Sequence, residues 1–116
     1  MTPLHMVLPI KTVSEANRHE HWGPRSKRVK TQRETARAHC DDAMQGHDFD
    51  CDYPLICKIV RVGKRKLDCD NLARSNKAIR DGIAESLCID DGDSAKLLWF
   101  YAQRKGKEYS VEVSIV

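Results

Sequence analysis

The sequence has no long apolar run. Its longest apolar stretches, Leu97 to Ala102 and Pro54 to Cys57, are far shorter than the roughly 20 residues that a membrane-spanning helix needs. Met1 is not followed by a basic start and an apolar core, so no export signal is visible. We therefore expect a protein that has no membrane partner.

Paired cysteine motifs are also absent. The five cysteines are an odd number and form no Cys-x-x-Cys pair, which argues against a disulfide framework and against a four-cysteine zinc site. A reducing cytoplasm is the expected compartment. There is no internal repeat or linker, so the 116 residues, 41% of them hydrophobic, are expected to form one domain over positions 1–116.

The charge of the chain is only mildly positive, but its distribution is uneven. A formal net charge of +3 does not by itself imply nucleic acid, whereas clustered cations do favour contacts with phosphates. A solvated helix surface is the other interpretation of the first cluster. The two clusters consist of Arg25, Lys27, Arg28, Lys30, Arg33 and Arg37, followed by Lys64, Arg65 and Lys66.

The apolar patterning predicts elements in the order β-α-β-α-β-β. Strands are expected at 4–10, 55–62, 97–104 and 109–116, and helices at 24–45 and 71–87. Pro9 places the first strand at a sheet edge or ends it there. The second strand has apolar side chains on both faces, as in a sheet interior, and Gly106 favours a hairpin between the last two strands. The expected fold class is α+β, with a small mixed sheet packed against two main helices.

Helical spacing separates core positions from polar ones. The helix at 24–45 presents Val29, Ala36, Cys40 and Ala43 on one side. The helix at 71–87 presents Leu72, Ile79, Ile83 and Leu87 on one side, and Asp70, Arg74, Lys77 and Asp81 on the other. Gly82 interrupts this second helix at a cost of about 1 kcal/mol, which suggests close packing or a functional approach.

Asp68 and Asp70 flank Cys69 where a strand exit meets a helix start. In an extended segment two such carboxylates can converge on one hard cation, and Mg²⁺ is usually held by one or two carboxylates. Asp91, in an acidic turn with Asp90, would supply a third carboxylate. The alternatives are simpler: aspartates at a helix start cap free amides, and Asp-Asp-Gly-Asp forms ordinary turns.

A phosphodiesterase also needs positive charge near the phosphate that it attacks. Lys77 is predicted to supply this charge, because it lies on the same predicted helix face as Asp70. Arg74, one turn earlier on that face, is the competing candidate. In the alternative interpretation, both cations belong to a solvated helix surface with ordinary ion pairs.

The motifs Leu67-Asp68-Cys69-Asp70-Asn71-Leu72, Lys77-Ala78-Ile79-Arg80-Asp81-Gly82 and Ile89-Asp90-Asp91, taken together, resemble the RusA family of Holliday-junction resolvases of phages and prophages. The likeness extends to Leu8-Pro9 and Ser14-Glu15-Ala16-Asn17 near the start and to the closing hairpin, and it covers nearly the whole chain.

The resemblance implies a RusA-like homodimer that binds four-way DNA junctions and makes paired, symmetric nicks in a bacterial or phage-infected cell. It assigns Mg²⁺, with Mn²⁺ as a possible substitute, to Asp68, Asp70 and Asp91, with Asp90 as an adjacent ligand. The family lysine commonly lies four residues after the second aspartate, which is Arg74 here; aligning through Lys-Ala-x-x-Asp selects Lys77 instead.

We therefore expect a structure-selective, metal-dependent endodeoxyribonuclease whose catalytic residues are Asp68, Asp70, Asp91 and Lys77. Two other functions are compatible with the sequence. One is a DNA-binding module of the same fold that has lost catalysis. The other is a structural protein in which the aspartates only order loops.

Overall fold

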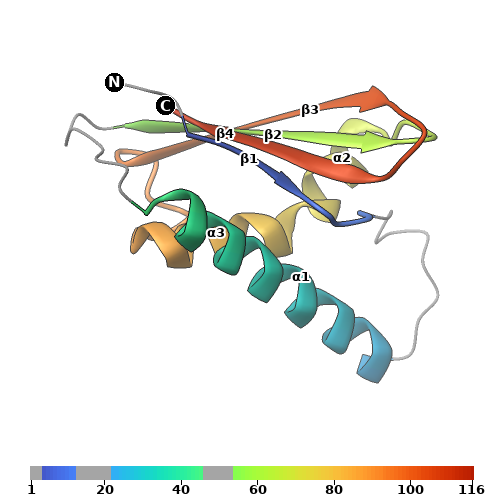
Figure 1. The fold of residues 1–116 in the computed structure, drawn as a ribbon, viewed down its shortest axis with the longest axis horizontal. Helices are drawn as coiled ribbons and strands as arrows, with labels where there is room; N and C mark the ends of the chain where they lie inside the picture. The colour runs from blue at the N-terminus through green and yellow to red at the C-terminus, as the bar shows by residue number, and fades with distance from the viewer. Residues whose placement is uncertain (1–3, 13–21, 46–53) are drawn as a thin grey trace.

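The computed structural model of the chain describes residues 4–12, 22–45 and 54–116. Residues 13–21 and 46–53, which connect the first three predicted elements and include the motif at 14–17, therefore lie outside the described residues. The described elements are, in chain order, β1 (Leu4–Leu8), α1 (Trp22–Ala43), β2 (Leu55–Gly63), α2 (Cys69–Ser75), α3 (Lys77–Leu87), β3 (Leu97–Lys105) and β4 (Ser110–Ile115). Figure 1 shows α1 and α3 beneath one face of a single sheet. The α+β class and the mixed sheet are confirmed.

The strand order in the sheet is β1-β4-β2-β3. β2 pairs with β3 in parallel and with β4 in antiparallel orientation, and β1 pairs with β4 in antiparallel orientation. The predicted hairpin between the last two strands is therefore wrong, because β2 lies between them. The connection crosses the end of β2, where the Gly106 amide donates to the Gly63 carbonyl over 3.0 Å. A short glycine loop predicts a chain reversal, but it does not determine which strand lies alongside.

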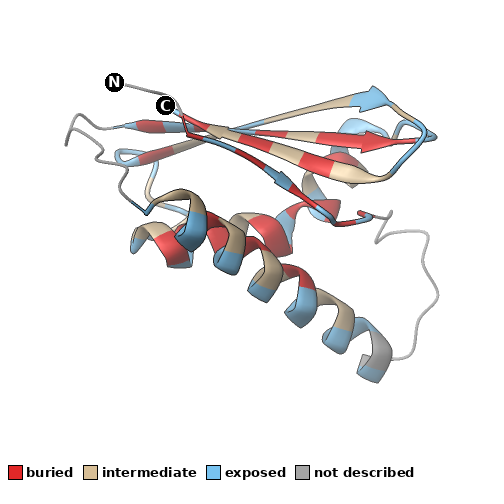
Figure 2. Cartoon of the chain, viewed as in Figure 1, coloured by how far each residue is buried: buried red, intermediate tan, exposed pale blue. Residues whose placement is uncertain are grey.

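β1 is an edge strand, as Pro9 predicts, and it ends at Leu8 rather than at Ile10. β2 is interior, as predicted, but its first half is buried on one face only. Ile56 is 42% exposed, and Lys58 is exposed beside it on the same face. No described helix covers this outer face of the sheet (Figure 2).

The core lies between the inner face of the sheet and the two helices below it. Ala36 and Cys40 of α1 are fully buried as predicted, while Val29 and Ala43 are partly buried. These small α1 side chains allow the helix to approach the sheet closely. The fully buried larger side chains include Leu8, Ile59, Val111 and Ile115 from the sheet and Ile79 and Ile83 from α3.

The predicted helix at 71–87 is two helices, separated at Asn76. Asn76 has φ −102° and ψ 3°. Its side-chain amide donates to the Leu72 carbonyl over 3.0 Å, and the Ser75 hydroxyl donates to the same carbonyl over 2.9 Å. Such side-chain bonds compete with the regular helical ladder. The single helical face that was expected to carry both Asp70 and Lys77 therefore does not exist.

Gly82 marks a close contact between α3 and α1. A Cβ atom at this position would lie 2.4 Å from the Arg33 carbonyl oxygen and 3.0 Å from Ala36 Cβ. Only a residue without a side chain allows the two helices to approach this closely. The predicted close packing at Gly82 is confirmed.

No helix within the described ranges combines the length and the apolar character that crossing a bilayer would require.

Candidate functional site

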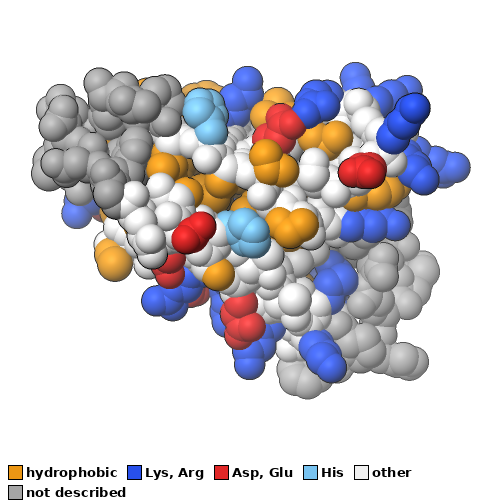
Figure 3. All heavy atoms as spheres, in the orientation of Figure 1, with side chains coloured by type: hydrophobic (Ala, Val, Ile, Leu, Met, Phe, Trp, Pro, Cys, Tyr) orange, Lys and Arg blue, Asp and Glu red, His pale blue; other side chains and the backbone are white. Residues whose placement is uncertain are grey.

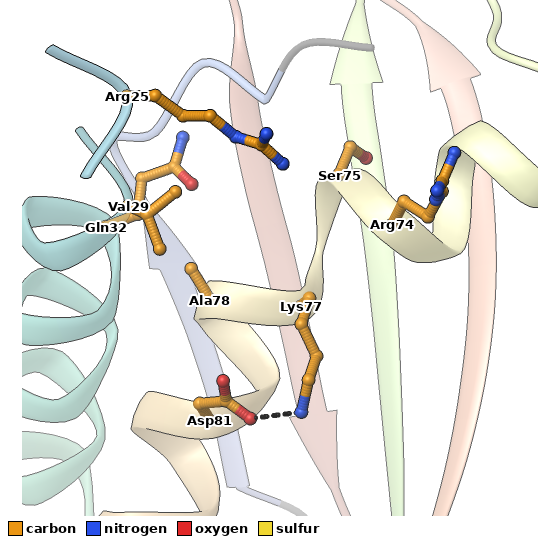
Figure 4. Close-up of a pocket in the computed structure, with 8 residues that line it drawn as sticks. All are labelled: Arg25, Val29, Gln32, Arg74, Ser75, Lys77, Ala78 and Asp81. Atoms are coloured by element: carbon orange, nitrogen blue, oxygen red, sulfur yellow. Dashed lines mark hydrogen bonds and ion pairs between the residues drawn. The ribbon is translucent and has the colours of Figure 1, made fainter. Parts of the chain in front are cut away.

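A cleft of about 380 Å³ lies between the N-terminal part of α1 and the junction of α2 with α3. Figure 4 shows Arg25 reaching from α1 across this gap towards Ser75, while Lys77 turns from the start of α3 towards Asp81. Three helices therefore bring residues that are distant in sequence to one opening. The lining consists of Arg25, Val29, Gln32, Arg74, Ser75, Lys77, Ala78 and Asp81.

The lining combines surface cations with a buried polar floor. Gln32 is 7% exposed and Ser75 is 2% exposed. Because the Ser75 hydroxyl donates to the Leu72 carbonyl, its oxygen can still accept a hydrogen bond. The three basic side chains of the cleft come from α1, α2 and α3, and Asp81 is the single acid among its lining residues. This arrangement favours an anionic ligand.

Lys77 lies between two carboxylates. Its Nζ is 2.6 Å from Asp81 Oδ1 and 2.9 Å from Asp91 Oδ2. These contacts, that with Asp81 first, raise the pKa of Lys77 above its usual range, and burial offsets part of the effect. The side chain therefore remains an ammonium ion throughout the neutral range.

Asp91 is held from several sides. Besides Lys77, Arg80 makes an ion-pair contact in which its Nε is 3.1 Å from Asp91 Oδ2. Arg80 Nη2 and Trp99 Nε1 donate to the Asp91 backbone carbonyl over 2.7 Å and 3.0 Å. The Lys77 hydrogen bond is the main cause of the lowered pKa of the Asp91 carboxyl, with Arg80 contributing, against a smaller effect of burial. Asp91 is therefore a fixed anion that positions two cations.

Asp68 and Asp70 lie at the start of α2. Asp68 is the N-cap of this helix, and its Oδ1 accepts a hydrogen bond from the Asn71 amide over 2.9 Å. Asp70 is exposed in the first turn. Asp90 Oδ1 accepts a hydrogen bond from the Gly92 amide over 3.0 Å. The capping and turn interpretations of Asp68 and Asp90 are thus observed in the structure.

The structure does not bring the three predicted metal ligands together. Within the described residues, no three or more His, Cys, Asp or Glu side chains are placed to hold a metal ion. Asp91 instead has Lys77 and Arg80 as its neighbours. Asp68, Asp70, Asp90 and Asp91 therefore do not form a shared cluster of three or more ligands among the described residues, although one or two carboxylates are enough for many Mg²⁺ sites.

The predicted DNA-binding cations fall into three groups. Arg25, Arg74 and Lys77 all line the cleft. Arg74 and Lys77, the two alternatives for the catalytic cation, are therefore both at this opening. Arg33 and Arg37 approach Glu85 of α3 to 3.6 Å and 3.4 Å, which neutralises part of the basic helix. The remaining predicted cations lie on the α1 surface or on the turn after β2, namely Lys27, Arg28, Lys30, Lys64, Arg65 and Lys66.

Arg80 and Trp99 were not predicted from the sequence to belong to the site. The Arg80 guanidinium stacks on the Trp99 ring at 5.0 Å, and Arg80 Nη1 donates to the Tyr101 hydroxyl over 3.2 Å. Arg80 follows Lys77 by three residues, which places both on neighbouring helix positions. This spacing from Lys77 was the feature of the sequence that could have identified Arg80 as part of the site.

No protein-family profile matches this sequence, and no curated protein matches it significantly. A function for the chain must therefore be inferred from its own residues and geometry.

Proposed function

We propose that this chain is a structure-selective endodeoxyribonuclease that binds Holliday junctions or related branched DNA and nicks the phosphodiester backbone, in recombination or repair. The observation that carries the proposal is that Arg25, Arg74 and Lys77, from three helices, line one cleft. Cations from three helices fit a phosphodiester better than a neutral ligand, and phosphate contacts fix the position of DNA without reading its sequence. The resemblance of the motifs to the RusA family supplies the reaction class.

The ion pairs of the cleft suit a phosphate-holding role. Asp81 and Asp91 fix the Lys77 ammonium in place before any ligand arrives. A preorganised cation stabilises charge that develops on a phosphate during attack, because it needs no reorientation at that moment. Arg25 reaches from the opposite wall towards Ser75, whereas Lys77 turns towards Asp81, so the two cations would contact different parts of a DNA backbone.

Mg²⁺, or Mn²⁺ in its place, belongs to the proposal through the resemblance alone. The carboxylates that would hold it are dispersed between the start of α2 and the turn before β3. The proposal therefore rests on the geometry of the cations.

A second function is favoured by one specific observation. Asp91 is engaged by two cations and does not form a site with Asp68 and Asp70. A DNA-binding module of this fold without catalysis would retain the cleft and have no need of the metal.

A labelled four-way junction, compared with a linear duplex of the same sequence, tests these two functions. With Mg²⁺ the wild-type protein is expected to nick the junction and spare the duplex. Asp70→Asn should bind the junction at least as tightly, since it removes repulsion of phosphate, and should not nick it. Asp42→Asn, which removes an exposed carboxylate near the other end of α1, is the matched control and should behave as wild type.

Two outcomes would count against the nuclease. If Asp70→Asn nicks at the wild-type rate, the assignment of Asp70 is wrong. If the wild-type protein binds the junction but nicks nothing with either metal, the DNA-binding module is the better description.

We further propose a homodimer acting in the cytoplasm of a bacterial or phage-infected cell. A two-fold dimer suits a junction whose two cut strands are related by approximate two-fold symmetry. The outer sheet face supports this, because it exposes the apolar side chains of Val7, Ile56 and Phe100. Light scattering should give the mass of a dimer for the wild type and a lower mass for Phe100→Ser; a monomeric wild type would contradict the proposal.

A further inference from the structure

Two turns meet at the end of the sheet where β2 and β3 finish. The Gly106 amide donates to the Gly63 carbonyl over 3.0 Å, and a Cβ atom on Gly106 would lie 2.6 Å from Val62 Cγ1. The connection between β3 and β4 is thereby held against the turn that follows β2. Figure 3 shows Lys and Arg side chains gathered at this end of the molecule. The basic turn surface consists of Lys11, Lys64, Arg65, Lys66, Lys105 and Lys107, all exposed.

A buried guanidinium lies beneath this surface. Arg61 is only 4% exposed. Its Nε donates to Thr12 Oγ1 over 3.0 Å, and its Nη1 donates to the Arg65 carbonyl over 2.6 Å. Burial lowers the pKa of Arg61, yet an arginine keeps its charge in proteins. Within the described part of the chain, its hydrogen-bond acceptors are all neutral oxygens.

Tyr109 links this buried charge to the surface. Its ring packs close to Gly63, next to the Arg61 side chain. Lys11 Nζ lies 4.6 Å from the centre of the same ring. The β1 end, the β2 turn and the β3–β4 connection thus contribute to one cationic region.

The charge of this region is unbalanced. The basic turn surface and Arg61 together carry seven cationic side chains, whereas its turns contain two acids, Asp68 and Glu108. Arg104 and Glu112, nearby on β3 and β4, form their own ion pair. Among the described residues no carboxylate pairs with Arg61, and a buried charge that lacks a counter-ion is costly, so an anion bound above Arg61 would stabilise the whole region.

We propose that the basic turn surface holds phosphates of a double-stranded DNA arm, as a second contact beyond the cleft. This inference rests on the proposed function and adds to it the path of the duplex. Exposed side chains on two turns reach a backbone without entering a groove, so the contact is independent of sequence. The exposed large apolar side chains among the described residues are Val7, Ile56, Phe100 and Val116, all outside this surface, which disfavours a membrane as its ligand.

The test removes two charges that no sequence motif identified. Lys105→Ala/Lys107→Ala should weaken binding of a linear duplex several-fold. The slope of log affinity against log salt should become shallower by about 1.8, because each lost phosphate contact contributes about 0.9. Both side chains are exposed, so the circular dichroism spectrum should not change. Lys58→Ala, an exposed lysine on the outer sheet face, is the control and should keep the wild-type slope.

The outcomes separate this inference from the proposed function. If the wild type nicks junctions but the double variant binds duplex with unchanged affinity and slope, the inference is overturned and the nuclease stands. If duplex binding depends on Lys105 and Lys107 but the protein nicks no junction, DNA binding by the basic turn surface is supported and the proposed nuclease function is wrong. Binding of the wild type to phosphatidylserine vesicles but not to duplex would overturn the DNA arm.

Discussion

Gly82 allows α1 and α3 to approach each other, and replacing it with alanine tests how far the fold depends on that contact. In an open helix this change would stabilise the protein by about 1 kcal/mol. Here the new Cβ would lie 2.4 Å from the Arg33 carbonyl oxygen, which is backbone and cannot rotate away. Overpacking of a core typically costs about 1–3 kcal/mol. With a backbone obstacle the cost lies at the upper end, so we expect a net loss of about 2 kcal/mol.

Urea unfolding followed by circular dichroism measures this loss as a change in the free energy of unfolding. Ala38→Gly, at an exposed position of α1, is the control and should lose about 1 kcal/mol through helix propensity alone. Because α1 must move away from α3 in Gly82→Ala, the opening between Arg25 and Lys77 should widen and junction binding should weaken. A gain in stability for Gly82→Ala would refute the argument from close packing.

Two further predictions concern titratable groups. The pKa of Asp91 is lowered from its ordinary value of 3.8, so its contribution to stability is present above that value and is lost as pH falls through the lowered pKa. The contribution is below about 1 kcal/mol because the ion pairs of Asp91 with Lys77 and Arg80 are partly exposed. In Asp91→Asn, the free energy of unfolding should therefore fall less steeply with decreasing pH between about pH 2 and 5. Superimposable plots of unfolding free energy against pH for the two proteins would contradict this prediction. Burial raises the pKa of Cys57 to about 12 and also raises that of Cys40, whereas Cys69 and Cys88 are exposed. Iodoacetamide at neutral pH, followed by peptide mapping of the folded protein, should label the second pair and spare the first; equal labelling would show that the first pair is accessible.

The elements of this fold could be predicted because their patterns are local. Alternating burial in β4 and the small buried side chains of α1 leave a periodic record in the sequence. The strand order leaves no such record. β3 and β4 are joined by a short glycine-containing turn, yet both pair with β2, and only the packing of the whole sheet decides that arrangement.

The candidate site was predictable as a set of residues but not as an arrangement. Arg25, Arg74 and Lys77 were each selected from the sequence, and they line one cleft. The break at Asn76 turns α3 away from the line of α2, so that Lys77 meets Asp91 and not Asp70. A helical wheel that assumes one continuous helix through residue 76 cannot predict this change in direction, because the break depends on side-chain hydrogen bonds to the Leu72 carbonyl.

The distribution of charge, more than its total, determines what this surface can bind. A net charge of +3 on 116 residues would steer DNA weakly. The fold pairs acids with cations of other elements, including Glu85 with Arg33 and Arg37, and Asp91 with Lys77 and Arg80. The turns after β2 and β3 keep exposed lysines, with two acids, Asp68 and Glu108, among them. The end of the sheet where β2 and β3 finish therefore carries a local positive excess, and binding there should depend steeply on salt.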